Sequence, residues 1–299
     1  FGFDYVNNPE RLTKPLIRII GKEKNLHPSI DFSNIHEHFR EATWEEALDY
    51  AANGIKKLRK NSFENKSSLA GFGSAKCSNE EAYLFQKLIR TGFKTNNVDH
   101  CTRLCHASSV AALLETIGSG SVTAPFYEVE HSEVIIVIGA NPTENHPVAA
   151  TFFKNAVKKG AKLIVMDPRG MALRKHATHM LQFKPGADVA MMNSIMNVII
   201  EEGLYNSEYI DDHTLGFEDL KKELKQYTPE KMEKISGIEP FVIKAVARLY
   251  ANTKKGLIFW GMGVSQHIHG TDNARCLISL ALMTGNVGRK GAGLHPLRG

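Results

Sequence analysis

Short apolar segments alternate with longer amphipathic ones, and this rhythm constrains the fold of the chain more than any other feature. VIIVIG (134–139), KLIVMD (162–167) and GLIFWG (256–261) have the length and composition of buried strands, and HMLQFK (179–184) is a more polar candidate. Strands that are apolar on both faces are typical of parallel sheets covered by helices on each side. We therefore expect an open, doubly wound, mostly parallel α/β sheet of the Rossmann-like kind.

Helical patterns fill the intervals between these strands. Apolar residues recur at helical spacing in five further stretches: 105–117, 146–160, 187–203, most of 206–252, and 270–284. Strands that alternate with helices of this length predict a doubly wound arrangement over residues 101–299.

Residues 1–100 have a different pattern. A capping box at Thr43 and Glu46 predicts the start of a helix over 42–60. A strand is expected at 68–73 and a helix over 79–93. The change of pattern at residue 101 predicts two domains, 1–100 and 101–299.

Composition excludes several classes of function. The net charge of +5 comes from scattered lysines, and no basic stripe is interleaved with aromatic residues, so nucleic-acid binding is a weak alternative. The apolar runs are too short to cross a membrane. Four cysteines in 299 residues do not form a disulfide framework, which favours a reducing compartment. The chain opens with Phe1 and stops at HPLRG, so we expect it to be a piece of a longer protein.

Each expected strand is followed by a loop that holds Gly or Pro together with polar groups. These loops are GANPTENHP (139–147), DPRG (167–170), KPGAD (184–188) and GMGVSQ (261–266). In doubly wound sheets, ligands bind beyond the carboxyl ends of the strands. Four such loops therefore predict one large ligand lying across this edge of the sheet.

An ordinary NAD site is not indicated. That site needs G-x-G-x-x-G directly after a strand, and neither GANPTE nor GMGVSQ supplies it. Asp167 can receive a ribose or a guanine edge, and Arg169 can neutralise phosphate. The residues therefore predict a nucleotide held by an unusual set of loops.

The stretch RLCHASS (103–109) places a thiol next to an imidazole where helix 105–117 is expected to begin. Cys101, Cys105 and His106 alone fall short of a zinc or cluster motif. A nucleophile–base pair stays open, but adjacent residues at a helix start point in different directions. For the dipeptide alone, a core cysteine beside a surface histidine is the simplest interpretation. The remaining hypothesis is a thiolate stabilised by the helix dipole, suited to a soft metal centre that a cofactor carries.

Several motifs together resemble the catalytic subunit of molybdenum- or tungsten-dependent formate dehydrogenases, within the dimethyl sulfoxide reductase superfamily. They are CTRLCHASSVAALLETIGSGSV, IGANPTENHP, MDPRG, GMGVSQ and LTGNVGRKGAGLHPLRG, and they follow the family order along nearly the whole chain. The resemblance implies that residues 1–100 are part of the second α/β domain of that fold. Residues 101–299 would be the third, pterin-nucleotide-binding domain.

The resemblance also implies roles for single residues. Cys105 stands where the family places the cysteine or selenocysteine that ligates the metal, His106 at the neighbouring active-site histidine, and Arg298 at the arginine that holds formate. Contacts to a bis-molybdopterin guanine dinucleotide centre with Mo or W are implied for residues of the four loops: Asn141, Glu144, Asn145, Asp167, Arg169, Gly186, Asp188, Gly261, Met262, Gly263 and Gln266. The other cysteines and the many other histidines are expected only to pack or to lie on the surface.

The implied reaction is the oxidation of formate to carbon dioxide, with electrons leaving through iron–sulfur clusters. A [4Fe-4S] cluster would lie in an N-terminal module outside this chain, next to iron–sulfur or flavin subunits. Similarity to cytoplasmic members implies NAD as the final acceptor, bound by another subunit. We expect a cytoplasmic protein without membrane insertion, and we expect the 299 residues alone to be inactive.

Three alternatives stay open. The first is a sister enzyme such as a nitrate reductase, the second a non-catalytic pterin-binding scaffold subunit, and the third a plain nucleotide-binding α/β module. Cys105, His106 and Arg298 together favour formate and argue against the scaffold.

Overall fold

The computed structural model describes residues 2–21, 33–61 and 68–298, which divide into two compact units. One unit comprises Phe1–Gly73 and Cys77–His100, and the other comprises Ser74–Lys76 and Cys101–Gly299. The division into the second and third domains of a larger fold stays a prediction. No helix in the described ranges is both long enough and apolar enough to cross a membrane.

The first unit is built around short strands and one long helix. Its elements are α1 (Gly2–Val6), β1 (Leu16–Arg18), α2 (Ile35–His38), β2 (Phe39–Glu41), α3 (Trp44–Asn61), β3 (Gly71–Gly73), α4 (Asn79–Lys87), a π-helical turn (Leu88–Gly92) and β4 (Val98–His100). Strands β1 and β2 pair antiparallel, and β3 and β4 pair parallel.

The helices predicted in this unit are present. Helix α3 begins directly after Thr43, whose Oγ1 accepts from the backbone N–H of Glu46 at 3.2 Å, which is one half of the predicted capping box; the Glu46 carboxylate accepts from Arg40 instead. The strand expected at 68–73 is shorter, β3, and the expected helix 79–93 continues beyond α4 as the π-helical turn. Strands β1, β2 and β4 were not predicted, because three-residue strands are too short to show a period.

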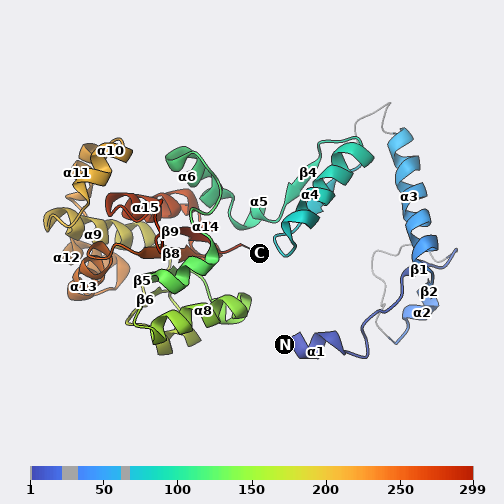
Figure 1. Ribbon diagram of the computed structural model, residues 1–299, viewed down its shortest axis with the longest axis horizontal. Coiled ribbons are helices and arrows are strands. Elements are labelled where there is room, and N and C mark those ends of the chain that lie inside the picture. The colour runs from blue at the N-terminus through green and yellow to red at the C-terminus, as the bar shows by residue number, and fades with distance from the viewer. Residues whose placement is uncertain (1, 22–32, 62–67, 299) are drawn as a thin grey trace. The chain divides into compact units, whose positions relative to one another are not determined.

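The second unit contains a five-stranded, wholly parallel sheet. Its strands are β5 (Val134–Ile138), β6 (Lys162–Met166), β7 (His179–Leu181), β8 (Gly256–Trp260) and β9 (Gly293–Pro296), in the spatial order β7-β6-β5-β8-β9. The order runs outward in both directions from β5, so the sheet is doubly wound and the switch point lies between β5 and β8 (Figure 1). The predicted fold class is confirmed.

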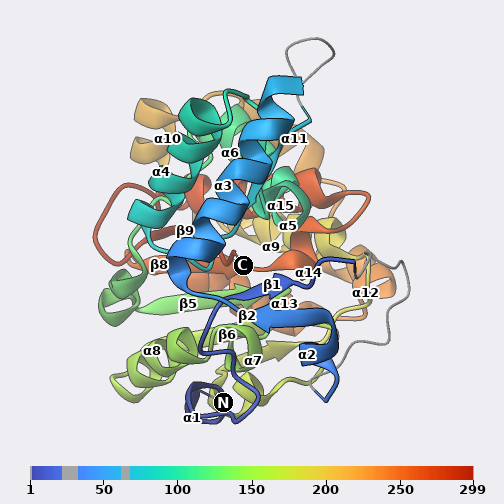
Figure 2. The same cartoon turned by 90° about the vertical axis from the view of Figure 1, so that its right-hand side faces the viewer.

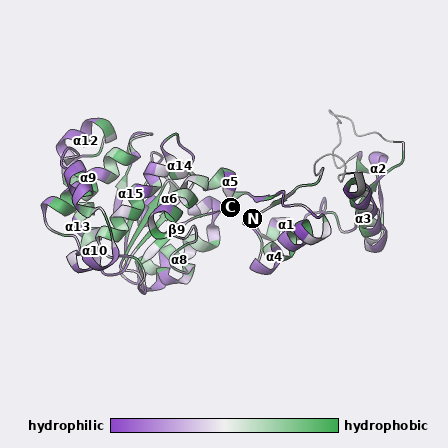
Figure 3. Cartoon of the chain, turned by 90° about the horizontal axis from the view of Figure 1, so that it is seen from above, coloured by the Kyte–Doolittle hydropathy of each residue, from purple (hydrophilic) through white to green (hydrophobic). Residues whose placement is uncertain are grey.

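Helices cover both faces of this sheet because alternate strand residues are apolar on both sides. Ile136, Ile138 and Trp260 pack with α6 (Ala107–Ile117), α9 (Asp188–Glu201), α13 (Pro240–Ala251) and α15 (Gly270–Met283) in one core cluster. Val137 and Phe259 pack with α8 (Pro147–Lys158) and two 3-10 helices, Phe126–His131 and Ala172–His176, in the other. Helix α8 lies on one side of the sheet and α6 and α15 on the other (Figure 2). Residues along the helices of this unit are in part hydrophilic (purple) and in part hydrophobic (green), as in helices that have one face on a core (Figure 3).

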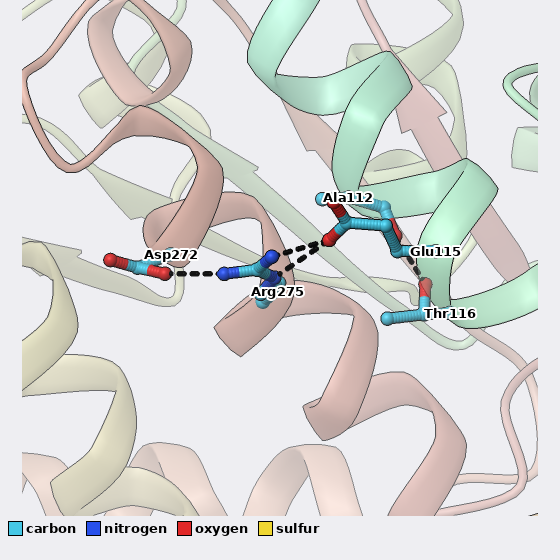
Figure 4. A network of polar contacts seen from close by, with 5 residues as sticks. All are labelled: Ala112, Glu115, Thr116, Asp272 and Arg275. Atoms are coloured by element: carbon cyan, nitrogen blue, oxygen red, sulfur yellow. Dashed lines mark hydrogen bonds and ion pairs between the residues drawn. The ribbon is translucent and has the colours of Figure 1, made fainter.

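Helices α6 and α15 pack closely, and an exposed charge network joins them. Arg275 of α15 bonds to Glu115 of α6 and, at 2.8 Å, to Asp272 one turn earlier (Figure 4). Exposed ion pairs contribute little to stability, about 0–1 kcal/mol each. The packing itself is apolar: Ala112 and Leu113 of α6 and Leu277 of α15 are fully buried.

The remaining elements are α5 (Thr102–Cys105), α7 (Pro142–Asn145), α10 (Ser207–His213), α11 (Phe217–Leu224), α12 (Pro229–Ser236) and α14 (Met262–Ser265). The structure differs from the prediction at several points. The helix expected over 105–117 begins two residues later, as α6, because His106 has the non-helical angles φ −140°, ψ 28°. Strand β7 ends at Leu181 rather than 184, and β9 was not predicted.

Candidate functional site

The loops after β5 and β8 cross at the switch point, and glycines allow their backbones to touch. Gly263 N–H donates to the carbonyl oxygen of Gly139 at 3.0 Å, and Gly261 N–H donates to that of Ile138 at 3.1 Å. A Cβ on Gly263 would lie 2.7 Å from the Gly139 oxygen, and a Cβ on Gly261 would lie 2.6 Å from the same atom. Only glycine fits at these positions. The crossing is therefore formed by backbone in direct contact with backbone.

A cavity of about 440 Å³ opens above this crossing. Nine of the residues predicted from the sequence to hold a nucleotide line it: Asn141, Glu144, Asn145, Asp167, Arg169, Gly186, Asp188, Met262 and Gly263. They come from the ends of β5, β6, β7 and β8, as the switch-point rule leads one to expect. Gly261 and Gln266 do not line the cavity but belong to the same loop as Met262.

Two buried carboxylates line this cavity in unlike environments. Asp167 follows β6, and its Oδ1 accepts from the backbone N–H of Arg169 at 2.8 Å. Burial raises the pKa of Asp167, while the hydrogen bond and charge of Arg169 oppose the rise. Burial also raises the pKa of Asp188, which is 2% exposed and whose Oδ1 has no hydrogen-bond partner among the described residues. A buried carboxylate beside a cavity, with an oxygen that has no partner among the described residues, is suited to a ligand that donates hydrogen bonds.

Cys105 is the last residue of α5, and three hydrogen bonds join its loop to the loop after β8. Ser265 Oγ donates to the carbonyl oxygen of Cys105 at 2.8 Å, and Gln266 Nε2 donates to that of Leu104 at 2.6 Å. Ser108 Oγ donates to the carbonyl oxygen of Ser265 at 2.8 Å. Cys105, which is 8% exposed, is thus held over the carboxyl end of β8. Gln266, predicted to contact the nucleotide, holds this loop in the structure.

His106 is fully buried and follows Cys105 as the N-cap of α6. Its Nε2 lies 2.8 Å from the carbonyl oxygen of Leu297, so Nε2 carries the proton and donates. Its Nδ1 lies 2.9 Å from Ser109 Oγ, which in turn accepts from Trp260 Nε1 at 2.8 Å. The imidazole therefore has partners other than the neighbouring thiol, and the interpretation of His106 as a surface histidine is wrong.

The groups at the two ends of this series of hydrogen bonds, the Trp260 indole and the Leu297 carbonyl group, determine which atom donates in each bond. An indole N–H only donates and a carbonyl oxygen only accepts, so the Ser109 hydroxyl donates to His106 Nδ1. Burial lowers the pKa of His106, and the charges of Arg298 and His146 lower it further, against the bond to Leu297. The structure therefore holds His106 as a neutral imidazole.

A second cavity, of about 380 Å³, lies beyond the end of β9. Arg298, His146 and His295 line it. One guanidinium nitrogen of Arg298 donates to the carbonyl oxygen of Gly120, while the buried Nε has no partner among the described residues. Burial lowers the pKa of Arg298, and Cys105 and Cys101 oppose that shift, which indicates that both thiols lie within electrostatic range of the guanidinium.

Sequence reasoning missed several residues of the two cavities. His267 lines the first together with Phe183 and Pro185, and His146 lines the second. The signal for His146 was its place between the predicted loop residue Asn145 and a helix-starting Pro147. No His, Cys, Asp and Glu side chains gather in threes to hold a metal ion within the described ranges.

The sheet order, the switch-point cavity and its polar loops define a doubly wound α/β unit with a polar cavity at its switch point. Residues 11–298 match the molybdopterin oxidoreductase family, and the chain belongs to that family. In structure, the chain is similar to acetylene hydratase from Pelobacter acetylenicus, with a TM-score of 0.75, 24% identity and coverage of 96% of this chain and 37% of that one. This likeness supports the fold.

Two proteins that are similar to the chain in sequence are named as formate dehydrogenases. The chain is 39% identical over 299 residues to the F420-dependent formate dehydrogenase subunit alpha of Methanocaldococcus jannaschii, covering 100% of this chain and 41% of the relative. It is 36% identical over 303 residues to formate dehydrogenase H of Escherichia coli, covering 100% of this chain and 40% of the relative. The chain thus spans about two fifths of the length of these relatives.

Proposed function

We propose that this chain is the nucleotide- and metal-binding part of the catalytic subunit of a formate dehydrogenase, which oxidises formate to carbon dioxide. The relatives' names support this substrate. The observation that carries the proposal is the convergence of a thiol, a buried imidazole and a half-buried arginine at the edge that also bears the nucleotide cavity. A plain nucleotide-binding module needs the cavity but none of these three groups.

The residues of the first cavity fit a molybdopterin guanine dinucleotide. Asp188 offers an unpaired buried carboxylate oxygen, an acceptor suited to the N–H groups of a guanine edge. Asp167 stands at the end of the second strand of the winding, where a carboxylate binds ribose hydroxyls in doubly wound folds. Arg169, exposed at the rim, can neutralise phosphate, and the glycines at the crossing leave space free of side chains for it. Mo or W and a second dinucleotide would complete the centre.

When bound, this centre supplies the two-electron oxidation. Cys105 would ligate its metal through the sulfur, held in place by the bonds from Ser265 and Gln266 to its loop. Arg298 would hold formate with the planar fork of its guanidinium, whose Nε is still without a partner among the described residues. His106 would stabilise charge or take a proton at Nδ1 once the Ser109 hydroxyl turns away.

Electrons would leave through a [4Fe-4S] cluster and iron–sulfur or flavin subunits that are not part of this chain. Residues 1–100 and 101–299 would be parts of the second and third domains of the full subunit. The relative from Methanocaldococcus jannaschii is named for F420. The proposed final acceptor is NAD, and the proposed location is cytoplasmic. An assay with NAD and with F420 distinguishes the two acceptors.

The proposal is tested on the full-length protein by metal and pterin analysis together with formate-dependent reduction of a dye. We expect Mo or W, guanine dinucleotide and dye reduction that depends on formate. Nitrate reduction without formate oxidation would instead indicate the sister enzyme. Metal-free protein without activity would indicate the scaffold or the plain nucleotide-binding module.

A further inference from the structure

Two histidines bond to consecutive carbonyl groups next to Arg298. His106 Nε2 lies 2.8 Å from the carbonyl oxygen of Leu297, and His146 Nε2 lies 2.9 Å from that of Arg298. A carbonyl oxygen only accepts, so both imidazoles donate. The backbone that carries the guanidinium is therefore held from α6 on one side and from the start of α8 on the other.

The other nitrogen of His146 is directed to the nucleotide cavity. Its Nδ1 lies 2.9 Å from Oδ1 of Asn145, which lines the 440 Å³ cavity. The Asn145 amide can bond to Nδ1 through its oxygen or, after a half-turn, through its NH2 group. The imidazole of His146 thus bonds both to a residue that lines the nucleotide cavity and to the backbone of Arg298.

This use of His146 is unusual for its position in α8. His146 is the N-cap of the helix, but its side chain makes no capping bond. Ser, Asn or Asp would cap the helix better. The imidazole instead bonds to a residue 152 positions away. Its contacts serve Arg298 and Asn145 rather than its own helix.

The Arg298 side chain depends on its backbone for its place. Within the described ranges its guanidinium has one bond, to the carbonyl oxygen of Gly120, and its buried Nε has none. A guanidinium with few partners of its own follows any shift of the main chain that carries it. His146, which also lines the second cavity, holds the position of that main chain through its bond to the Arg298 carbonyl oxygen.

We propose that His146 is a positioning residue that couples the nucleotide cavity, through Asn145, to the placement of the Arg298 guanidinium for a small carboxylate substrate. The inference deepens the proposed function and rests on it. A nucleotide seated against Asn145 fixes the amide, the amide fixes the ring, and the ring fixes the Arg298 carbonyl group. The arginine is then in place before the substrate arrives, which lowers the cost of binding it.

The test compares His146→Asn and His146→Gln in the full-length holoenzyme. The shorter Asn amide reaches the position of Nδ1 but not of Nε2, so it loses the bond to Arg298. The longer Gln amide nitrogen reaches the position of Nε2 and keeps that bond. The readout is the formate concentration that half-protects Arg298 from phenylglyoxal, followed by mass spectrometry, and it needs no turnover. KM and kcat for formate are measured in parallel, at equal metal and pterin content.

We expect the half-protecting formate concentration to rise on the order of tenfold in His146→Asn, as for the loss of one hydrogen bond. KM should rise with it, while kcat stays within about twofold. His146→Gln keeps the bond to Arg298 but loses the bond to Asn145, so its half-protecting concentration should rise only about threefold. An unchanged half-protecting concentration in His146→Asn, or an equal rise in both variants, overturns the inference and leaves the proposed function standing.

Failure of formate to protect Arg298 in the wild type rejects the proposed role of Arg298 and the inference with it. If His146→Asn does not take up the cofactor, Asn145→Leu replaces it, with a rise of about threefold expected and no rise counting against the coupling.

Discussion

The indole Nε1 of Trp260 donates to Ser109 Oγ at 2.8 Å, and this bond between the end of β8 and the first turn of α6 fixes the orientation of a third residue, His106. Trp260, Ser109 and His106 are each fully buried. Because the serine hydroxyl both accepts and donates, it is the one group through which the indole and the imidazole are satisfied together.

Ser109→Ala should therefore be costly. The change leaves the Trp260 N–H and His106 Nδ1 without their partner, and each unsatisfied buried group costs about 1–3 kcal/mol. We expect a loss of roughly 2–4 kcal/mol in the free energy of unfolding. Urea unfolding followed by tryptophan fluorescence in a Trp44→Phe background measures it, because Trp260 is then the only tryptophan.

The matched control is Ser194→Ala. Ser194 is also fully buried, but its hydroxyl donates to the carbonyl oxygen of Met191 in its own helix and holds no second side chain. We expect a loss of about 1 kcal/mol or less there. Equal losses in the two variants would show that the Trp260–Ser109–His106 chain adds nothing beyond one serine hydrogen bond.

Gly263→Ala should disrupt the crossing of the loops after β5 and β8. The new Cβ would lie 2.7 Å from the Gly139 oxygen and 2.8 Å from its Cα, and neither backbone atom can move without shifting the strand end. We expect a loss of roughly 1–3 kcal/mol in stability, and less bound cofactor in the full-length protein. Gly170→Ala is the control, since a Cβ there meets only side-chain atoms at 3.6 Å or more. A stable Gly263→Ala variant with a full complement of cofactor would contradict the argument.

The strands that are apolar on both faces were the clearest to predict from the sequence, and the edge strand β9 was missed. Strands β5, β6 and β8 are each a run of apolar residues, and burial on both sides makes such a run necessary. Strand β9 reads GLHP, lies at the edge of the sheet and ends in Pro296, so no apolar run marks it. Its pairing with β8 comes from tertiary contact, which local pattern does not encode.

The candidate site divides in the same way. Residues that directly follow a predicted strand, such as Asn141 and Asp167, could be placed at one edge because parallel strands end together. His146 and Ser109 could not, because their roles depend on partners 152 and 151 positions away. The interpretation of His106 as a surface residue failed for the same reason. The residue is buried, and it is bonded to Leu297 directly and to Trp260 through Ser109, both far away in the sequence.

His295 should make the second unit sensitive to acid. Its ring stacks on Phe259 with centroids 5.0 Å apart, and burial lowers its pKa from 6.5 to about 4. Above pH 6.5 both folded and unfolded states hold it neutral. As the pH falls from about 6.5 to about 4 the unfolded state takes up the proton first, so stability declines by at most about 3 kcal/mol and then levels off.

The measurement is the free energy of unfolding between pH 7 and pH 4, compared between the wild type and His295→Phe. An apolar ring keeps the stacking on Phe259 and cannot titrate, so the difference between the two proteins isolates His295 from the other acids and histidines. We expect the variant to lose less stability than the wild type over this range. Parallel curves for the two proteins would show that His295 titrates alike when folded and unfolded.

Arg298→Lys should cost far more than a change that conserves charge usually does. Lysine lacks the planar fork that holds a carboxylate in two bonds, and such charge-assisted pairs are about twice as strong as neutral ones. In the full-length enzyme we expect kcat/KM for formate to fall by roughly 10- to 300-fold at constant metal content. Arg248→Lys, at an exposed ion pair with Glu202, is the control and should change nothing measurable. A near-normal kcat/KM in Arg298→Lys would show that this guanidinium does not grip the substrate.

The last prediction separates the two residues at the centre of RLCHASS. If Cys105 ligates the metal and His106 only handles charge and protons, Cys105→Ala should alter the metal's spectroscopic signature and abolish formate oxidation even where the pterins still bind. His106→Ala should keep metal and pterins but lower kcat, on the order of 10²-fold as for a lost proton-transfer group. A nucleophile–base pair predicts instead that both variants keep an unchanged metal signature and that alkylation of Cys105 traps a covalent site. Because the structure directs the His106 nitrogens to Ser109 and Leu297, we expect the two variants to differ. Metal spectra of both, recorded side by side, decide: an unperturbed centre in Cys105→Ala would falsify the assignment of this thiol as the metal ligand.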